Sequence, residues 1–152
     1  MKFYKIAGLA VAVASLAMAS PVWAADHQVK MVNKDSEGRP MQFEPAFLAI
    51  APGDTVTFVP TDKAHNAEFL PGMLPEGAEE WKGKVNEAIT VTYSVEGFYG
   101  VRCAPHFGMG MVGLIQVGDS ATLPDVSGVK LPGKAKTRMT ELLGQVGVPP
   151  AN

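Results

Sequence analysis

Short apolar or alternating runs, separated by glycine and proline, recur along the chain from about residue 26 to residue 117. Such runs are typical of short strands joined by tight turns, so the pattern predicts an all-β sandwich. The continuous apolar run at 46–50 fits a core strand, although its pattern alone does not separate a strand from a buried helix. The predicted strands cover residues 27–33, 44–50, 54–59, 88–95, 97–102 and 111–117.

The pattern changes after residue 118. Residues 134–146 place Arg138, Met139, Leu142, Leu143 and Val146 near one face at helical spacing, which predicts a helix packed on the sandwich. We also predict a short helix at 123–129 and one helical turn at 76–81, inside a stretch that proline and glycine otherwise break. The expected architecture is thus a β-sandwich with a C-terminal α-helical extension from about residue 119.

The first 24 residues have the pattern of a secretory signal peptide. Lys2 and Lys5 precede an apolar run at 6–18 that is too short to span a bilayer, and Val22-Trp23-Ala24 supplies small residues for cleavage. We expect cleavage after Ala24 or Ala25, an exported chain in the periplasm, and no membrane span thereafter. The alternative for this segment is an uncleaved anchor or a buried helix.

Removal of the leader lowers the number of basic residues from 13 to 11, against 15 acidic residues, and gives a formal net charge of −4. This charge argues against non-specific binding to nucleic acid. Residues 25–152 have the length of one domain with one core. Nothing in the sequence requires more than a monomer.

The only cysteine, Cys103, lies close to a histidine and a methionine. A lone cysteine in an oxidising compartment cannot form an internal disulfide, so metal ligation explains it better. His106 and Met111 follow within eight residues, and thiolate, imidazole and thioether together suit copper. A blue-copper site needs a second histidine. His65, which follows the predicted strand at 54–59, is a better candidate than His27, which lies near the expected mature N-terminus, where chain ends are often loose.

The spacing Cys103-x₂-His106-x₄-Met111 with an upstream His65-Asn66 resembles the cupredoxin family. The loop motif Cys-x-Pro-His-x-Gly-Met-Gly-Met is similar to that of the pseudoazurin branch of the family. The resemblance extends over nearly the whole chain expected to be exported. Two positions depart from the branch: Ala104 stands where threonine is expected, and Phe107 where tyrosine is usual. Neither residue belongs to the expected ligand set.

The resemblance implies a Greek-key sandwich with one type 1 copper ion bound by His65, Cys103, His106 and Met111. It favours Met111 over Met109 as the axial ligand, because four residues rather than two then separate the methionine from His106. It also implies that the amide of Asn66 ties the His65 segment to the Cys103 segment. Pro105 limits the freedom of the loop and has no N–H to donate to the thiolate.

The resemblance further implies a one-electron carrier rather than an enzyme. Its partners would be redox proteins, either a denitrification reductase such as nitrite reductase or c-type cytochromes. The edge of His106 would emerge through an apolar patch inside a basic ring. The residues expected on this docking face are Lys63, Lys82, Arg102, Lys134, Phe107 and Met109.

Two other classes of function stay open at this point. A periplasmic copper chaperone or storage protein would also be exported and hold copper, although such proteins usually gather several methionines and histidines at flexible sites. A zinc site or a Cys–His nucleophile is the other possibility. Structural zinc prefers several cysteines and histidines without methionine, and a catalytic cysteine needs an oriented base, for which only His65 or His106 is available.

Overall fold

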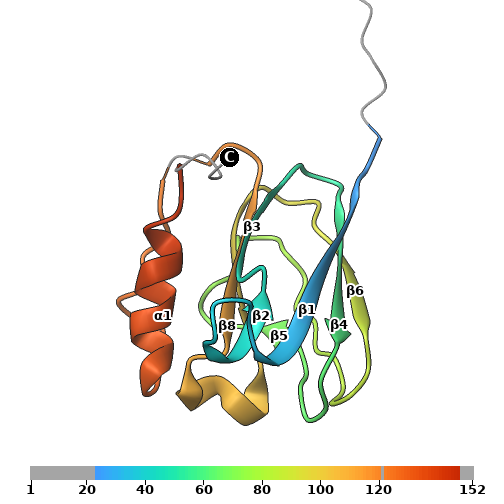
Figure 1. Cartoon of the computed structure of the whole chain (residues 1–152). Coiled ribbons are helices and arrows are strands. Elements are labelled where there is room, and N and C mark those ends of the chain that lie inside the picture. The colour runs from blue at the N-terminus through green and yellow to red at the C-terminus, as the bar shows by residue number, and fades with distance from the viewer. Residues whose placement is uncertain (1–22, 121, 148–152) are drawn as a thin grey trace, which may run out of the picture.

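The computed structural model describes residues 23–120 and 122–147. The signal peptide expected at residues 1–24 therefore lies outside the described residues, apart from Trp23 and Ala24. Regular structure begins at Asp26 with a strand that runs the length of the molecule (Figure 1). No helix in the described part of the chain combines the length and the apolar character that a bilayer crossing requires.

Two four-stranded sheets pack face to face (Figure 1). The first has the order β2-β1-β4-β6, built from β1 (Asp26–Lys34), β2 (Pro40–Glu44), β4 (Thr55–Pro60) and β6 (Ile89–Thr92). The second has the order β3-β8-β7-β5, built from β3 (Phe47–Ile50), β5 (Glu68–Phe69), β7 (Gly97–Arg102) and β8 (Val112–Val117). β1 runs parallel to β4 and β3 parallel to β8, whereas the other neighbours are antiparallel. The predicted all-β sandwich is confirmed.

The single strand predicted at 44–50 is wrong, because the chain changes sheets within it. β2 ends at Glu44 in the first sheet, and β3 begins at Phe47 in the second. Pro45 stands between them after a cis peptide bond, and without an N–H it cannot continue a strand ladder. The pattern does not predict β2 itself, because Pro40 normally signals a break; proline is tolerated here since β2 is an edge strand.

The helical turn predicted at 76–81 is also wrong. The backbone N–H of Ala78 closes a turn on the carbonyl of Pro75, and Gly77 takes a left-handed φ of 84°, which no helix continues through. The chain then runs on to Trp81, whose ring stacks on Phe58 at 5.3 Å between centroids. Trp81 is thus a packing residue at the edge of the core.

The helix predicted at 123–129 does not form. The carboxylate of Asp125 instead accepts a hydrogen bond from the backbone N–H of Ser127 at 2.9 Å, and the backbone N–H of Val129 closes a turn on the carbonyl of Val126. Such local side-chain bonds compete with helix formation. Periodicity alone does not detect this competition.

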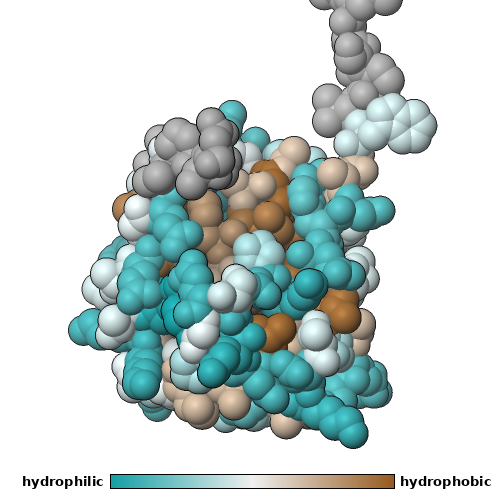
Figure 2. Space-filling model, in the orientation of Figure 1, coloured by the Kyte–Doolittle hydropathy of each residue, from teal (hydrophilic) through white to brown (hydrophobic). Residues whose placement is uncertain are grey.

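The helix predicted at 134–146 is confirmed as α1 (Lys134–Leu143), which ends early at Gly144. Ala135, Arg138, Met139 and Leu142 form its buried face, and α1 packs beside β8 (Figure 1). Hydrophilic residues cover most of the face shown in Figure 2, and brown apolar surface gathers mainly in its upper half. The core between the sheets is closely packed, with Phe43, Phe58, Tyr93, Leu114 and Ile115 almost fully buried.

Candidate metal centre

A short loop between β7 and β8 carries most of the predicted ligands. Cys103 directly follows β7, and the 3₁₀ helix η1 (Ala104–Met109) comes next. The backbone N–H of Cys103 donates to the carbonyl of Met111 at 3.1 Å, and the N–H of Met111 donates to the carbonyl of His106 at 3.3 Å. Gly110 ends η1 with a φ of 95°, a left-handed conformation that glycine adopts without strain. The turn therefore holds Cys103, His106 and Met111 together.

His65 comes from the loop between β4 and β5, and a second loop fixes its position. The backbone N–H of Asn86 donates to the carbonyl of His65 at 2.8 Å. The side-chain oxygen of Asn86 accepts from the N–H of Ala64, whose φ of 72° is unusual for a residue other than glycine. The sequence analysis does not find Asn86, because an asparagine between two predicted strands has the pattern of an ordinary turn residue.

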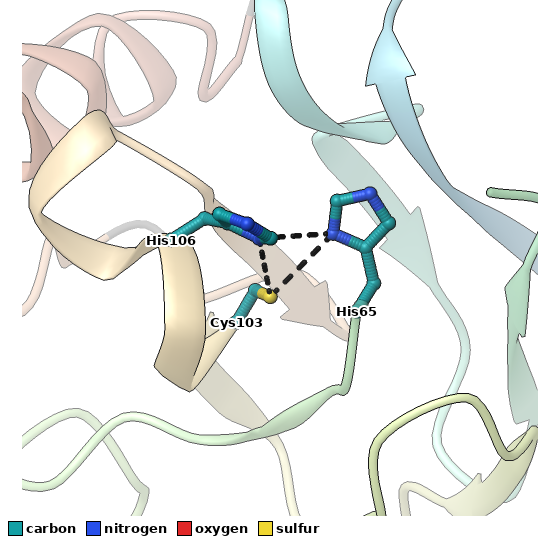
Figure 3. Close-up of side chains that lie close together, drawn as sticks. All are labelled: His65, Cys103 and His106. Atoms are coloured by element: carbon teal, nitrogen blue, oxygen red, sulfur yellow. Dashed lines mark hydrogen bonds between the residues drawn. The ribbon is translucent and has the colours of Figure 1, made fainter. Parts of the chain in front are cut away.

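The side chains of His65, Cys103 and His106 converge on one point (Figure 3). The two histidine Nδ1 atoms lie 3.1 Å apart, and Cys103 Sγ lies 3.8 Å from Nδ1 of His65 and 3.6 Å from Nδ1 of His106. Cys103 and His65 are fully buried, whereas His106 is partly exposed. Two imidazole nitrogens and one sulfur thus form the trigonal set expected of a His₂Cys copper site.

Burial sets the protonation of these ligands. It lowers the pKa of His65, as does the nearby His106, so the His65 ring is neutral and keeps a lone pair for a metal. Burial raises the pKa of the Cys103 thiol, while the backbone N–H groups of Asn66 and His106 act in the opposite direction. A metal bound here must therefore displace the thiol proton.

The two candidate methionines differ sharply in exposure. Met111 is 0 % exposed, whereas Met109 is 46 % exposed and lies on the surface of η1. Because a thioether ligand must face the buried sulfur and imidazoles, the structure supports Met111 as the axial donor and leaves Met109 on the outer surface. His27 bonds to Asp54 instead, through Nε2, and takes no part in this centre.

The outer nitrogen of His65 has a partner that the sequence analysis does not predict. His65 Nε2–H donates to the side-chain oxygen of Asn33 at 2.9 Å. This bond fixes the tautomer that leaves Nδ1 free for a metal, as outer contacts of metal-binding histidines commonly do. Asn33 lies near the end of β1, beside the parallel strand β4 that leads to His65. Only the strand pairing brings the two residues together.

Asn66 links the two ligand segments through its buried amide. Its oxygen accepts from the backbone N–H of Ala104 at 2.8 Å, and its nitrogen donates to the carbonyl of Gly83 at 3.1 Å. The amide nitrogen also lies 3.2 Å from the carboxylate of Glu68, which pairs with Arg102 at 2.7 Å. The residue after the histidine ligand is thus bonded to the residue after the cysteine ligand.

The donor set fits copper better than other metals. Thiolate and thioether are soft ligands, and imidazole suits both oxidation states of copper. Bound copper supplies a one-electron couple. The fold holds Cys103, His106 and Met111 on one loop between paired strands and His65 on the loop after β4, so little rearrangement accompanies a change of charge.

Comparison with known proteins agrees with this chemistry. Residues 29–118 match the family model of copper binding proteins, plastocyanin/azurin family. The chain is 53 % identical over 138 residues to pseudoazurin from Paracoccus pantotrophus, which covers 90 % of this chain and 94 % of that protein. The structure of a pseudoazurin from Sinorhizobium superposes with a TM-score of 0.78 at 51 % identity, covering 82 % of this chain and 98 % of the other.

A second solved structure, pseudoazurin from Hyphomicrobium denitrificans, gives a TM-score of 0.75 at 44 % identity, over 80 % of this chain and 98 % of that one. The resemblance to pseudoazurins, first noted in the sequence of the Cys103–Met111 loop, is therefore confirmed over most of the chain. The type 1 copper site of this chain consists of His65, Cys103, His106 and Met111. The chain belongs to the plastocyanin/azurin family of copper-binding proteins and, within it, to the pseudoazurins, non-enzymatic carriers of single electrons.

Proposed function

We propose that this blue copper protein works in the periplasm and donates single electrons to a denitrification reductase, with a copper-containing nitrite reductase as the first candidate. The signal peptide would direct export and would be removed after Ala24 or Ala25. The observation that carries the proposal is the position of His106. This ligand lies in the metal centre, yet it is partly exposed on a loop of exposed small and apolar residues.

The surface around His106 suits brief docking. Ala104 and Pro105 are exposed on one side of it, and Met109 is 46 % exposed on the other. Beside Ala104 and Pro105 lies a mainly apolar hollow that includes Val85. An apolar contact of this kind excludes water from the edge of the histidine without requiring the large interface of a stable complex. An electron could then cross through His106.

Basic residues surround this loop, as the docking proposal requires. Lys63 is exposed on the loop that leads to His65, and Lys134 begins α1 with its Cβ close to Gly110. Lys82 is 72 % exposed, although its ammonium lies 3.4 Å from the buried carboxylate of Glu68. Arg102 also pairs with Glu68, and its guanidinium lies 5.2 Å from the centre of the Phe107 ring. The buried carboxylate of Glu68 thus partly neutralises the positive charge of Lys82 and Arg102, while the outer surface of the basic ring stays positive.

Such a basic ring would attract an acidic partner and speed encounter, an effect that salt screens. The test compares two double variants in which the charge of two lysines is reversed. The first carries Lys63→Glu and Lys82→Glu. The matched control carries Lys30→Glu and Lys136→Glu, at two lysines that are exposed outside the proposed ring. We expect only the first pair to slow electron transfer to nitrite reductase at low salt, with both proteins equally blue. Equal rates for the two double variants at every ionic strength would remove the basic ring from the proposal.

The choice of acceptor is tested separately. Stopped-flow mixing of the reduced, colourless protein with nitrite reductase, and with a c-type cytochrome, would measure the appearance of the blue band as the copper is oxidised. We expect rapid, salt-dependent oxidation by the reductase. Rapid exchange with the cytochrome alone would make the cytochrome the partner and overturn the reductase proposal while leaving the carrier function in place.

A further inference from the structure

A second cluster of nitrogen ligands lies at the start of the mature chain. The cut after Ala24 places Val22 three residues before the cleaved bond, whereas a cut after Ala25 would place the bulky Trp23 there. The exported chain then begins Ala25-Asp26-His27. A free amine with a histidine at the third position offers four nitrogens: the amine, two backbone amides and the imidazole Nδ1. Four nitrogens in one plane are the preferred surroundings of Cu(II) and Ni(II).

The structure gathers the two ends of this cluster on one carboxylate. The backbone nitrogen of Ala25 donates to Asp54 Oδ1 at 2.8 Å, and His27 Nε2–H donates to Asp54 Oδ2 at 2.8 Å. The backbone N–H of Ala51 holds the same carboxylate in place at 3.0 Å. Nδ1 of His27 has no hydrogen-bond partner among the described residues, so it is the nitrogen left for a metal. A carboxylate behind a metal-binding histidine is a common supporting arrangement.

The surroundings attract cations. His27 and Asp54 line an open hollow together with the acidic residues Glu96 and Asp119. Asp26 adds a further exposed carboxylate. No lysine or arginine is among the described residues that line this hollow. A divalent cation is therefore favoured here by the local charge as well as by the ligands.

The pairing of the first residues of β1 with β4 must open for the four nitrogens to surround one ion. The first residues of β1 are held to β4 by the bond from Thr55 N–H to the carbonyl of Ala25 and by the contact between the side chains of Thr55 and Asp26. The pairing of β1 with β4 continues to Met31, so release of Asp26 and His27 leaves the rest of the sheet intact. Ends of strands open at small free-energy cost.

We propose that the mature N-terminus, Ala25-Asp26-His27, is a second metal site that binds Cu(II) or Ni(II) in a plane of four nitrogens. The inference rests on the export and cleavage proposed above. The site would lie at the end of the sandwich opposite η1 (Figure 1). β1 connects the two centres, because His27 is its second residue and Asn33, the partner of His65, lies near its other end. The rise per residue of a strand places these two residues roughly 20 Å apart.

The test uses exported protein whose type 1 site is already filled and oxidised. One further equivalent of Cu(II) is added, and electron paramagnetic resonance is recorded. We expect a new signal with a wide parallel hyperfine splitting and nitrogen couplings, while the blue absorption stays unchanged. Ni(II) should give a diamagnetic planar complex at the same site. His27→Ala should weaken binding about 100-fold or more, beyond the loss that removal of an outer contact causes.

A matched pair of variants isolates the backbone ligand. Asp26→Pro removes one of the amide nitrogens that the metal needs, whereas Asp26→Ala removes only the carboxylate. We expect loss of the second signal in the first variant and retention in the second. A blue band in both would show that they fold and fill the type 1 site.

Two results would overturn the proposal without touching the electron-carrier function. The first is a mass spectrum of the exported protein that begins at Asp26, which would place the histidine second. The second is equal uptake of the added Cu(II) by the parent protein and by His27→Ala. Failure of the type 1 centre, by contrast, would appear as a missing blue band before any copper is added.

Discussion

His65 Nε2–H donates a hydrogen bond of 2.9 Å to the side-chain oxygen of Asn33. The first residue is a copper ligand, and the second lies near the end of β1, 32 positions earlier in the chain. The bond orients the imidazole so that Nδ1 faces Cys103 and His106. It couples the metal centre to the parallel pairing of β1 with β4.

Asn33→Ala should weaken copper binding. Loss of the outer partner frees the His65 ring to rotate and to change tautomer, and such losses typically cost 10–100-fold in metal affinity. A competition titration with a copper chelator measures the change. Asn33→Asp, which keeps an acceptor oxygen, should recover most of the affinity. An unchanged affinity in the alanine variant would show that the strand alone orients the ring.

Asn66→Ala should destabilise the folded chain even without metal. The change leaves the part-buried N–H of Ala104 and the buried carbonyl of Gly83 without their partner. Each unsatisfied buried group costs about 1–3 kcal/mol. Denaturant unfolding of the metal-free protein would measure the loss. If the free energy of unfolding is unchanged, then water satisfies these groups and Asn66 is not a structural link between the ligand segments.

Met111→Leu should keep the blue colour and raise the reduction potential. The axial thioether tunes the potential of such sites, and its donation stabilises the oxidised ion, so its loss favours the reduced form. Voltammetry of the copper protein measures the shift. Met109→Leu is the matched control: its side chain is exposed on η1, and we expect the spectrum and the potential to stay as they are. A shift in the control alone would reverse the assignment of the two methionines.

Asp35→Asn should lower stability at neutral pH but not in strong acid. Burial of Asp35 acts to raise its pKa, but hydrogen bonds from the backbone and guanidinium of Arg39 outweigh it, so the folded pKa lies below the ordinary 3.8. A carboxyl with a lowered pKa contributes stability above its unfolded pKa, and loses this contribution as the pH falls through the folded value.

The difference in unfolding free energy between the parent and Asp35→Asn should therefore be constant from pH 7 down to about 4 and shrink below that, near the unfolded pKa of aspartate. Urea unfolding at a series of pH values measures this difference. Asp119→Asn, at an exposed position, serves as a control for the general effect of acid. A difference that persists at the lowest pH would mean that shape, not charge, determines the effect at Asp35.

The sequence predicts the ligands well because they are local or chemically rare. Cys103, His106 and Met111 occupy one short turn, and the lone cysteine of an exported chain requires an explanation. The outer contacts are harder to find. Asn33 and Asn86 meet His65 only through strand pairing and loop packing, and an asparagine has no distinctive pattern of its own.

Element boundaries show the same division. The short, mostly buried runs of β7 and β8 are predicted almost to the residue, because each strand has one neighbour on either side in a regular sheet. The strands within 40–50 are not predicted correctly, because the pattern does not separate the roles of two prolines. Pro40 begins an edge strand, whereas Pro45 interrupts the strand ladder. At residues 123–129, the Asp125 bond to Ser127 overrides a weak helical period.

The measurement that tests the central claim most directly is a visible and electron paramagnetic resonance spectrum of the exported protein, loaded with Cu(II) and then reduced with ascorbate. The account predicts an intense blue or blue-green band with a narrow parallel hyperfine splitting. The band should bleach on reduction, return on oxidation and be absent from Cys103→Ser. A pale protein that holds only Cu(I) would contradict the account and favour a copper chaperone.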